Sequence, residues 1–209
     1  MKFLNIIPIA IFSLILTGVS NAQDQYKRFQ FEFGYGIALT GDTEKNDFQL
    51  LRGVEFSTPL IGKNIEIATK YVFKNRRFIG LGFTMQSYTN ILNGTGVLDE
   101  DRVLVFDDYR LEDEIQYIEL QYGKFFDNGL DLTMSAFTIF YFNPILDQEP
   151  NGFELGNPGR SSDDLGLAIA LGYRLFENNS INVSLRAKLS YSLNGVEAIT
   201  LTPLVRFNF

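Results

Sequence analysis

The stretch Ile181-Asn-Val-Ser-Leu-Arg-Ala-Lys-Leu-Ser-Tyr-Ser-Leu193 decides the fold. Every second residue in it is apolar or aromatic, and the residues between them are small, polar or basic. Side chains on a β-strand point alternately to opposite faces, so this period predicts a strand with one apolar face and one polar face. Both charged residues, Arg186 and Lys188, fall on the polar face.

The same alternation recurs along the chain. Several of the alternating runs exceed the roughly 5–6 residues of an ordinary strand and reach the roughly 9–11 residues that a tilted strand needs to cross a bilayer. The predicted strands are Arg28–Thr40, Asp47–Thr58, Ile65–Lys74, Phe78–Thr89, Ile115–Phe126, Leu130–Phe142, Leu165–Phe176, Ile181–Leu193 and Val196–Phe209.

The chemistry of the two faces indicates the fold class. The apolar faces carry almost no charge, whereas the opposite faces combine small residues with charged ones. A soluble β-sandwich would hide its large residues inside, but a transmembrane barrel turns them toward lipid and keeps its interior polar. We therefore expect an all-β protein, an antiparallel up-and-down transmembrane β-barrel of eight to ten strands, with the soluble sandwich as the alternative.

The strand number depends on two segments. Bacterial single-chain barrels have an even number of strands, short periplasmic turns and long outer loops. A strand at Arg102–Tyr109 would bring the count to ten, which is slightly preferred, whereas omitting the weak segment Asp47–Thr58 would give eight. Asn90–Glu114 and Asn143–Asp164 are expected to be long outer loops, the second because of its prolines and glycines.

The first 22 residues are typical of a signal peptide. Lys2 precedes a mostly apolar run, and Ser20-Asn-Ala22 supplies the small residues that a signal peptidase recognises. Cleavage after Ala22 would leave residues 23–209 as one barrel domain. The chain has no cysteine, so neither a lipid anchor on cysteine nor a disulfide is expected.

The end of the chain carries a resemblance. Val205, Phe207 and Phe209 share one face of the last predicted strand, and the chain stops on Phe209. This pattern resembles the C-terminal assembly signal of bacterial outer-membrane β-barrels. With the signal peptide and the alternating strands, the chain resembles small Bacteroidota-type outer-membrane barrel proteins, the PorT-like or OmpX-like group. The resemblance implies a Gram-negative outer-membrane location in contact with lipid, and folding by the barrel assembly machinery.

Composition argues against several functions. The chain has 25 acidic and 18 basic residues, and this negative balance argues against a nucleic-acid partner. It has no histidine, the usual general acid–base residue, and no cysteine for thiol chemistry. We therefore expect neither an enzyme nor a cofactor, and no catalytic residue is nominated.

The charged residues on the polar faces form the best-defined candidate site. Acids dominate the early strands and bases the late ones, and closure of the barrel would bring Glu32 near Arg206. The side chains could form an ion-pair network that plugs the lumen, which the narrowness of a small barrel favours. They could instead line a narrow channel for small solutes or hydrophobic molecules, with inner-face glycines leaving room. The set is Glu32, Glu55, Glu66, Lys70, Glu119, Arg174, Arg186, Lys188 and Arg206.

The segment 99–114 is strongly acidic. Its carboxylates could bind Ca²⁺ weakly, but the spacing of an EF-hand is absent, and a solvated outer loop is the simpler interpretation. The apolar run from Val103 to Phe106 could be a strand or an edge that docks an extracellular or envelope partner. The sequence thus favours a non-enzymatic barrel that acts through its outer loops. The candidate cation ligands are Asp99, Asp101, Asp107, Asp108 and Asp113.

Overall fold

The computed structural model describes residues 28–40, 54–57, 61–99, 102–149, 152–178, 180–193 and 195–209. The signal peptide predicted at residues 1–22 lies outside these ranges. No helix among the described residues is long and apolar enough to cross a membrane. The strands are β1 (Phe29–Thr40), β2 (Val54–Ser57), β3 (Ile61–Val72), β4 (Arg77–Asp99), β5 (Arg102–Phe125), β6 (Leu130–Glu149), β7 (Gly152–Glu177), β8 (Ile181–Ser192) and β9 (Gly195–Asn208).

The strands form one closed antiparallel barrel. Neighbours follow the order β4-β3-β1-β9-β8-β7-β6-β5, and β5 pairs with β4 to close the ring of eight strands. The short β2 adds no strand to the ring, because it pairs only with β4. It does so from Ile91 onward, past Ser87, where the pairing of β4 with β3 ends. The predicted antiparallel barrel of eight to ten strands is therefore confirmed.

The slight preference for ten strands is wrong. Arg102–Tyr109 is no separate span, because it is the first part of β5 and continues without interruption into the barrel wall. Of the weak segment Asp47–Thr58, the structure describes only the four residues of β2.

The first and last barrel strands meet at a continuous seam. Phe33 of β1 lies opposite Val205 of β9, and Phe31 lies opposite Phe207. The backbone N–H of Phe209 donates to the carbonyl oxygen of Phe29 over 2.8 Å. The terminal residues of the expected assembly signal thus lie on the strand that closes the barrel, and the seam satisfies backbone groups that an open edge would expose.

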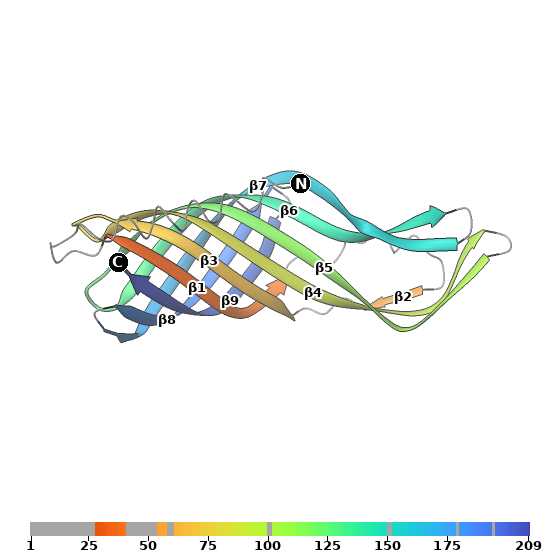
Figure 1. The fold of residues 1–209 in the computed structure, drawn as a ribbon, viewed down its shortest axis with the longest axis horizontal. Helices are drawn as coiled ribbons and strands as arrows, with labels where there is room; N and C mark the ends of the chain where they lie inside the picture. The colour runs from red at the N-terminus through yellow and green to blue at the C-terminus, as the bar shows by residue number, and fades with distance from the viewer. Residues whose placement is uncertain are drawn as a thin grey trace.

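The two ends of the barrel differ in length. At one end, tight turns join the strands, and the chain finishes there at Phe209 (Figure 1). At the other end, pairing of β5 with β6 stops at Glu114, whereas the β4–β5 and β6–β7 pairs continue as two hairpins. Figure 1 shows both hairpins extending beyond the barrel.

The prediction that two segments are long loops is therefore wrong, because both contain strand residues. Asn90–Glu114 and Asn143–Asp164 contribute to the two projecting hairpins. Register shifts interrupt the ladders, one of them between Asn143 and Ile145, on either side of Pro144. A bulge leaves a residue unpaired, so a proline without an N–H can be accommodated in the strand.

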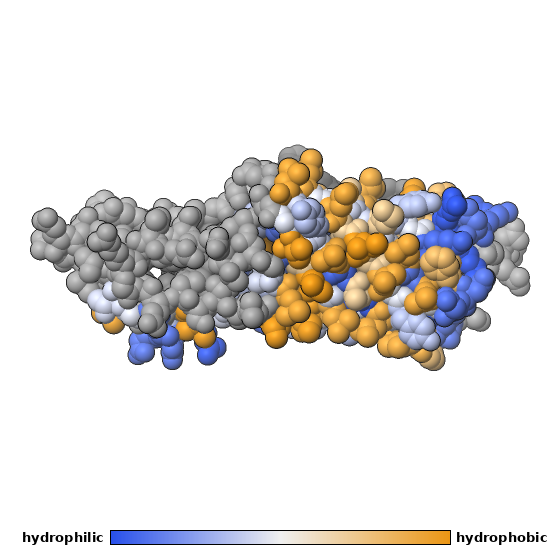
Figure 2. Space-filling model, turned by 180° about the vertical axis from the view of Figure 1, so that it is seen from behind, coloured by the Kyte–Doolittle hydropathy of each residue, from blue (hydrophilic) through white to orange (hydrophobic). Residues whose placement is uncertain are grey.

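The barrel is apolar outside and polar inside. Outward residues such as Leu81, Leu120 and Leu167 are more than 60% exposed. Figure 2 shows, on one face of the barrel, a hydrophobic band next to a hydrophilic end, which is the end with the tight turns. Buried positions are mostly small, polar or charged, and this inversion is typical of barrels that face lipid.

Aromatic side chains outside the barrel gather near the turn end. Tyr71 makes edge-to-face contacts with Phe29 and Phe73, at centroid distances of 5.2 and 5.1 Å. Two other aromatic side chains point inward. Tyr88 is 3% exposed, and Phe125 packs on Phe78 with a centroid distance of 4.7 Å.

The seam predicts a cross-link in a chain that has no cysteine of its own. Phe33→Cys combined with Val205→Cys should form a disulfide in the folded barrel, because the Cα atoms of opposed antiparallel residues lie within about 4.5–5.5 Å of each other. A shift in gel mobility that reductant reverses would measure it. The matched pair Phe33→Cys and Leu201→Cys lies four positions, or about 13 Å, out of register and should stay uncross-linked. Equal cross-linking of both pairs would contradict the register.

Candidate functional site: the charged interior of the barrel

Glu32 on β1 is the centre of the first group of interior charges. Its carboxylate lies 2.8 Å from Lys70 Nζ, 2.7 Å from Arg206 Nε and 2.9 Å from an Nη of Arg186. Arg206 also pairs with Asp131, which reaches the group from β6. One buried carboxylate thus connects β1 with β3, β8 and β9 through charged hydrogen bonds.

A second group lies one step further along the barrel, toward the projecting hairpins. Lys188 Nζ is 2.7 Å from Glu119 and 3.6 Å from Glu66, and Thr84 donates to Glu119 over 2.6 Å. Arg186 joins the two groups, because its other Nη lies 3.4 Å from Glu66. The eight charges of both groups therefore form one network.

Neutral side chains add hydrogen bonds to two of these carboxylates. Asn64 donates to Glu66 over 2.9 Å, and Thr202 donates to the same oxygen over 3.1 Å. Gln121 donates to Glu119 over 3.1 Å. Carboxylates that keep hydrogen bonds on both oxygens are the form in which buried charge is tolerated.

The network is balanced in charge. Every member is at least 93% buried. A lone buried charge costs several kcal/mol, so the equal numbers of acids and bases are a physical requirement for closing the barrel around them. The acids are Glu32, Glu66, Glu119 and Asp131, and the bases are Lys70, Arg186, Lys188 and Arg206.

The structure brings together seven of the nine lumen residues expected from the sequence. Arg174 does not join them, because it lies near the turn at the end of β7, partly exposed, and pairs with Glu177. Of Glu55 only the backbone in β2 is described. The seven are Glu32, Glu66, Lys70, Glu119, Arg186, Lys188 and Arg206.

Two buried acids were missed by the sequence interpretation. Asp131 shares the inward face of β6 with Thr133 and Ser135, so the alternation of that segment could have identified it. Glu197 was harder to assign, because a bulge between Ser190 and Tyr191 shifts the register of β9 against β8. Glu197 is buried and accepts hydrogen bonds from Tyr141 and Ser192.

The inward glycines do not leave open room in the lumen, contrary to expectation. A Cβ atom added at Gly166 would collide with the ring of Phe137, and one added at Gly172 would collide with the carboxylate of Asp131. These glycines make space for a neighbour's side chain, which lets large residues fit inside a narrow barrel. Gly34, Gly36, Gly80 and Gly82 are similarly crowded by neighbouring atoms.

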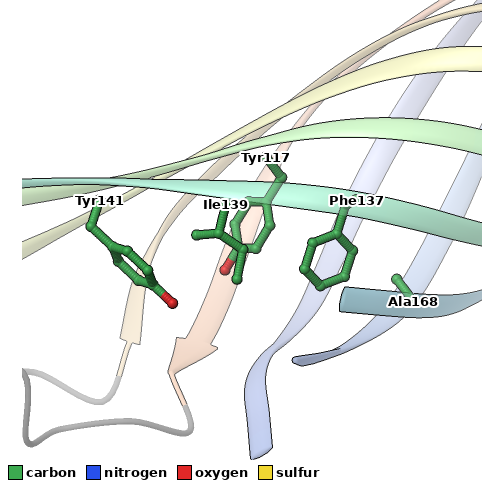
Figure 3. Close-up of a cluster of buried hydrophobic side chains, with 5 residues drawn as sticks. All are labelled: Tyr117, Phe137, Ile139, Tyr141 and Ala168. Atoms are coloured by element: carbon green, nitrogen blue, oxygen red, sulfur yellow. The ribbon is translucent and has the colours of Figure 1, made fainter. Parts of the chain in front are cut away.

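An aromatic layer lies next to the ion network, toward the projecting hairpins. Tyr117 and Phe137 contact edge to face at a centroid distance of 5.3 Å, and both are almost fully buried. Figure 3 shows their rings beside Ile139 and Tyr141, with Ala168 on the neighbouring strand. The sequence carried a signal for this layer, since Phe137, Ile139 and Tyr141 alternate with outward residues on one segment. The interior thus holds a charged layer and an aromatic layer.

The acidic segment on the projecting hairpin does not gather its carboxylates. Asp108 exchanges hydrogen bonds with Asn93, over 2.7 and 3.1 Å. Among the described residues, no three acidic or other metal-binding side chains come together. Of the remaining candidate ligands, Asp107 is exposed and Asp113 half-buried, Asp99 is described only in its backbone, and Asp101 lies outside the described residues.

Comparison with known proteins adds similarity at the level of the fold. No protein-family model and no curated protein matches the chain. Among solved structures, neisserial surface protein A matches with 12% identity and a TM-score of 0.42, over 86% of this chain and 97% of that one.

Two further solved structures are similar to the same degree. Ail of Yersinia pestis, in complex with the heparin analogue sucrose octasulfate, has 10% identity, a TM-score of 0.42 and coverage of 87% and 99%. OprG, an outer-membrane protein of Pseudomonas aeruginosa, has 14% identity, a TM-score of 0.40 and coverage of 88% and 94%. We therefore base the function on this chain's own side chains.

Removing one partner of a buried pair should be costly. Lys188→Met leaves Glu119 charged without its closest cation, and we expect the free energy of unfolding to fall by about 3–5 kcal/mol. The double variant Lys188→Met with Glu119→Gln should recover most of this loss, because no unpaired charge remains. Urea unfolding in lipid vesicles measures both.

The matched control for this experiment is the partly exposed pair at the turn end. Glu177→Gln removes the partner of Arg174 at a site that water reaches, so it should cost less than about 1 kcal/mol. A loss at Lys188 no greater than the loss at Glu177 would contradict the buried network.

Proposed function

We propose that the chain is a non-enzymatic integral protein of the Gram-negative outer membrane, with an interior closed by its ion-pair network. It acts through the projecting hairpins, in partner binding or envelope structure. The observation that carries the proposal is the inversion of the barrel, apolar outside and charge-balanced inside. The absence of histidine and cysteine supports a non-enzymatic role.

The outer surface supports the membrane location. A soluble protein rarely exposes contiguous apolar surface of this extent. Here many outward side chains of the long strands are exposed and apolar, and Figure 2 shows a hydrophobic band on one face of the barrel. Phe29, Tyr71 and Phe73 pack together next to the tight turn that follows β3. Aromatic rings at such borders are typical of the membrane–water interface.

Biogenesis follows from the same proposal. The signal peptide would be cleaved after Ala22, and the barrel assembly machinery would recognise the last strand through Val205, Phe207 and Phe209. The role of β9 as the closing strand supports this. We place the chain with the small Bacteroidota-type barrels, on its alternating strands.

The plugged interior is supported by packing and by charge. A barrel of eight strands is only wide enough for its own side chains. Here those side chains are cross-linked by ion pairs from strands on different sides of the barrel, such as Glu119 on β5 and Lys188 on β8. A water-filled path would need these pairs to separate.

The projecting hairpins support the binding role. On the N-terminal side of Glu114, β5 pairs with β4 alone. No other described strand pairs with the opposite backbone edge of this part of β5. Unpaired edges accept an added strand from a partner chain. Val105 and Tyr109, on this part of β5, are exposed apolar and aromatic side chains that could contribute to such a contact.

Planar-bilayer recording tests whether the interior is closed. We expect the folded protein to give no steady single-channel current, because every path crosses paired charges. Lys188→Ser with Glu119→Ser should introduce current, since the two short hydroxyl side chains leave a polar gap that water can fill. The control Arg174→Ser with Glu177→Ser changes a pair outside the network and should stay silent. A heat-shift gel confirms folding, and discrete openings of the unchanged protein would favour the alternative, a narrow channel for small solutes.

Cysteine labelling in intact cells tests the orientation. Val105→Cys on the projecting hairpin should react with a membrane-impermeant maleimide, because Val105 is 77% exposed and lies at the proposed outer end. Asn75→Cys lies in the exposed turn between β3 and β4, and it should react only after the outer membrane is permeabilised. The opposite pattern would contradict the orientation, and labelling of both in intact cells would contradict a membrane barrier between the two ends.

A further inference from the structure

The turn end of the barrel contains a cavity that the proposed function does not use. Its volume is about 650 Å³, within the usual range for small-molecule sites. Residues of β1, β7, β8 and β9 line it, together with the three tight turns. Arg206, a member of the ion network, also lines it. We call it the turn-end cavity.

Three carboxamide side chains line adjacent strands of the turn-end cavity. Gln30 on β1 lies opposite Asn208 on β9, and Asn182 on β8 lies opposite Arg206. The side-chain oxygen of each carboxamide is buried and accepts no hydrogen bond, and Asn182 as a whole is only 6% exposed. A buried acceptor without a donor destabilises the fold, so three together mark a place where donors are missing.

These amide oxygens can be offered to a ligand. The last torsion of an asparagine or glutamine side chain is broad and has low barriers, so the terminal amide can turn toward the cavity. Each carboxamide presents both a carbonyl acceptor and an NH₂ donor. A suitable ligand therefore carries several groups that both donate and accept hydrogen bonds.

The charges around the turn-end cavity are already paired. Arg76 forms an ion pair with Asp127 across two turns, and Arg174 forms one with Glu177. Arg206 is held by acids of the ion network. An anion or a cation would have to compete with these partners, so the lining favours a neutral ligand.

An aromatic ring completes the lining. Phe125 borders the cavity, and the guanidinium carbon of Arg206 lies 5.1 Å from its centroid. Phe78 and Arg206 pack against this ring, so it offers the cavity an apolar edge. An apolar edge next to carboxamides suits a molecule that carries both C–H groups and hydroxyls. We propose that the turn-end cavity binds a neutral saccharide. In the proposed orientation this cavity opens to the periplasm. That location rests on the proposed function, whereas the binding itself does not.

Calorimetric titration of the folded protein in lipid nanodiscs tests the site, with chitotriose as the probe. Nanodiscs leave both barrel ends open to solvent, so the result does not depend on orientation in the cell. We expect saturable binding with a Kd of about 1 mM or tighter. Asn182→Ala with Asn208→Ala should weaken it about tenfold or more, because each lost carboxamide removes hydrogen bonds to the ligand.

The control is Asn75→Ala, which changes an exposed carboxamide at the same end that does not line the cavity; it should keep the Kd within about twofold. Asn182→Leu, which removes the carboxamide but keeps a side chain of similar size, provides a second variant if the double one fails the heat-shift test. Absence of saturable chitotriose binding would overturn the proposal, as would equal binding by the cavity variants. Tighter binding of inorganic phosphate or of spermidine than of chitotriose would overturn the choice of a neutral ligand.

Discussion

The charges inside the barrel can be buried only together, and the rest of the structure depends on this constraint. A single ionised group in such an interior costs several kcal/mol, and its partner repays the cost only at hydrogen-bonding distance. Glu32 lies on the first strand and its partner Arg206 on the last, 2.7 Å apart. Because the partners are almost the whole chain apart in sequence, the network is complete only when β1 meets β9. Interior electrostatics and closure of the sheet are thus one event, and a partly closed barrel would leave charges without partners.

The same constraint explains why the inner wall combines long charged side chains with glycine. Arg186 has to reach acids from β1 and β3, so it needs free space across the lumen. Gly172 on β7 makes room for one of the acids, because the carboxylate of Asp131 occupies the volume that a side chain at residue 172 would take. An eight-stranded ring has no spare width. The apolar outer face and the crowded inner face are therefore two consequences of one alternation, since each strand must supply lipid contacts and lumen packing at successive residues.

Alternation was enough to predict the barrel and seven residues of the network, because side-chain direction in a strand depends only on position along it. Alternation did not predict burial where burial depends on the position of a residue along the barrel axis or on a bulge. Arg174 has the right face but lies too close to the turn to be buried. Glu197 is the extra residue of a bulge, between Val196 and Ala198, which no local pattern reveals. The projecting hairpins were mistaken for loops because prolines and acids are poor strand residues, and only pairing with a neighbouring strand, a non-local interaction, overcomes that preference.

A closed interior would confine recognition to the two ends of the barrel, and the two ends would bind ligands through different groups. The projecting hairpins expose backbone edges, so contact there gains main-chain hydrogen bonds and depends little on the identity of individual side chains. The turn-end cavity differs, because the buried groups without a hydrogen-bond partner that line it are side-chain amides such as Asn182. Recognition there depends on which hydrogen bonds a small ligand can complete, and such sites reject ligands that leave buried polar groups unpaired. Since Arg206 contacts both this cavity and Glu32, a ligand in the cavity would lie one side chain away from the centre of the ion-pair network.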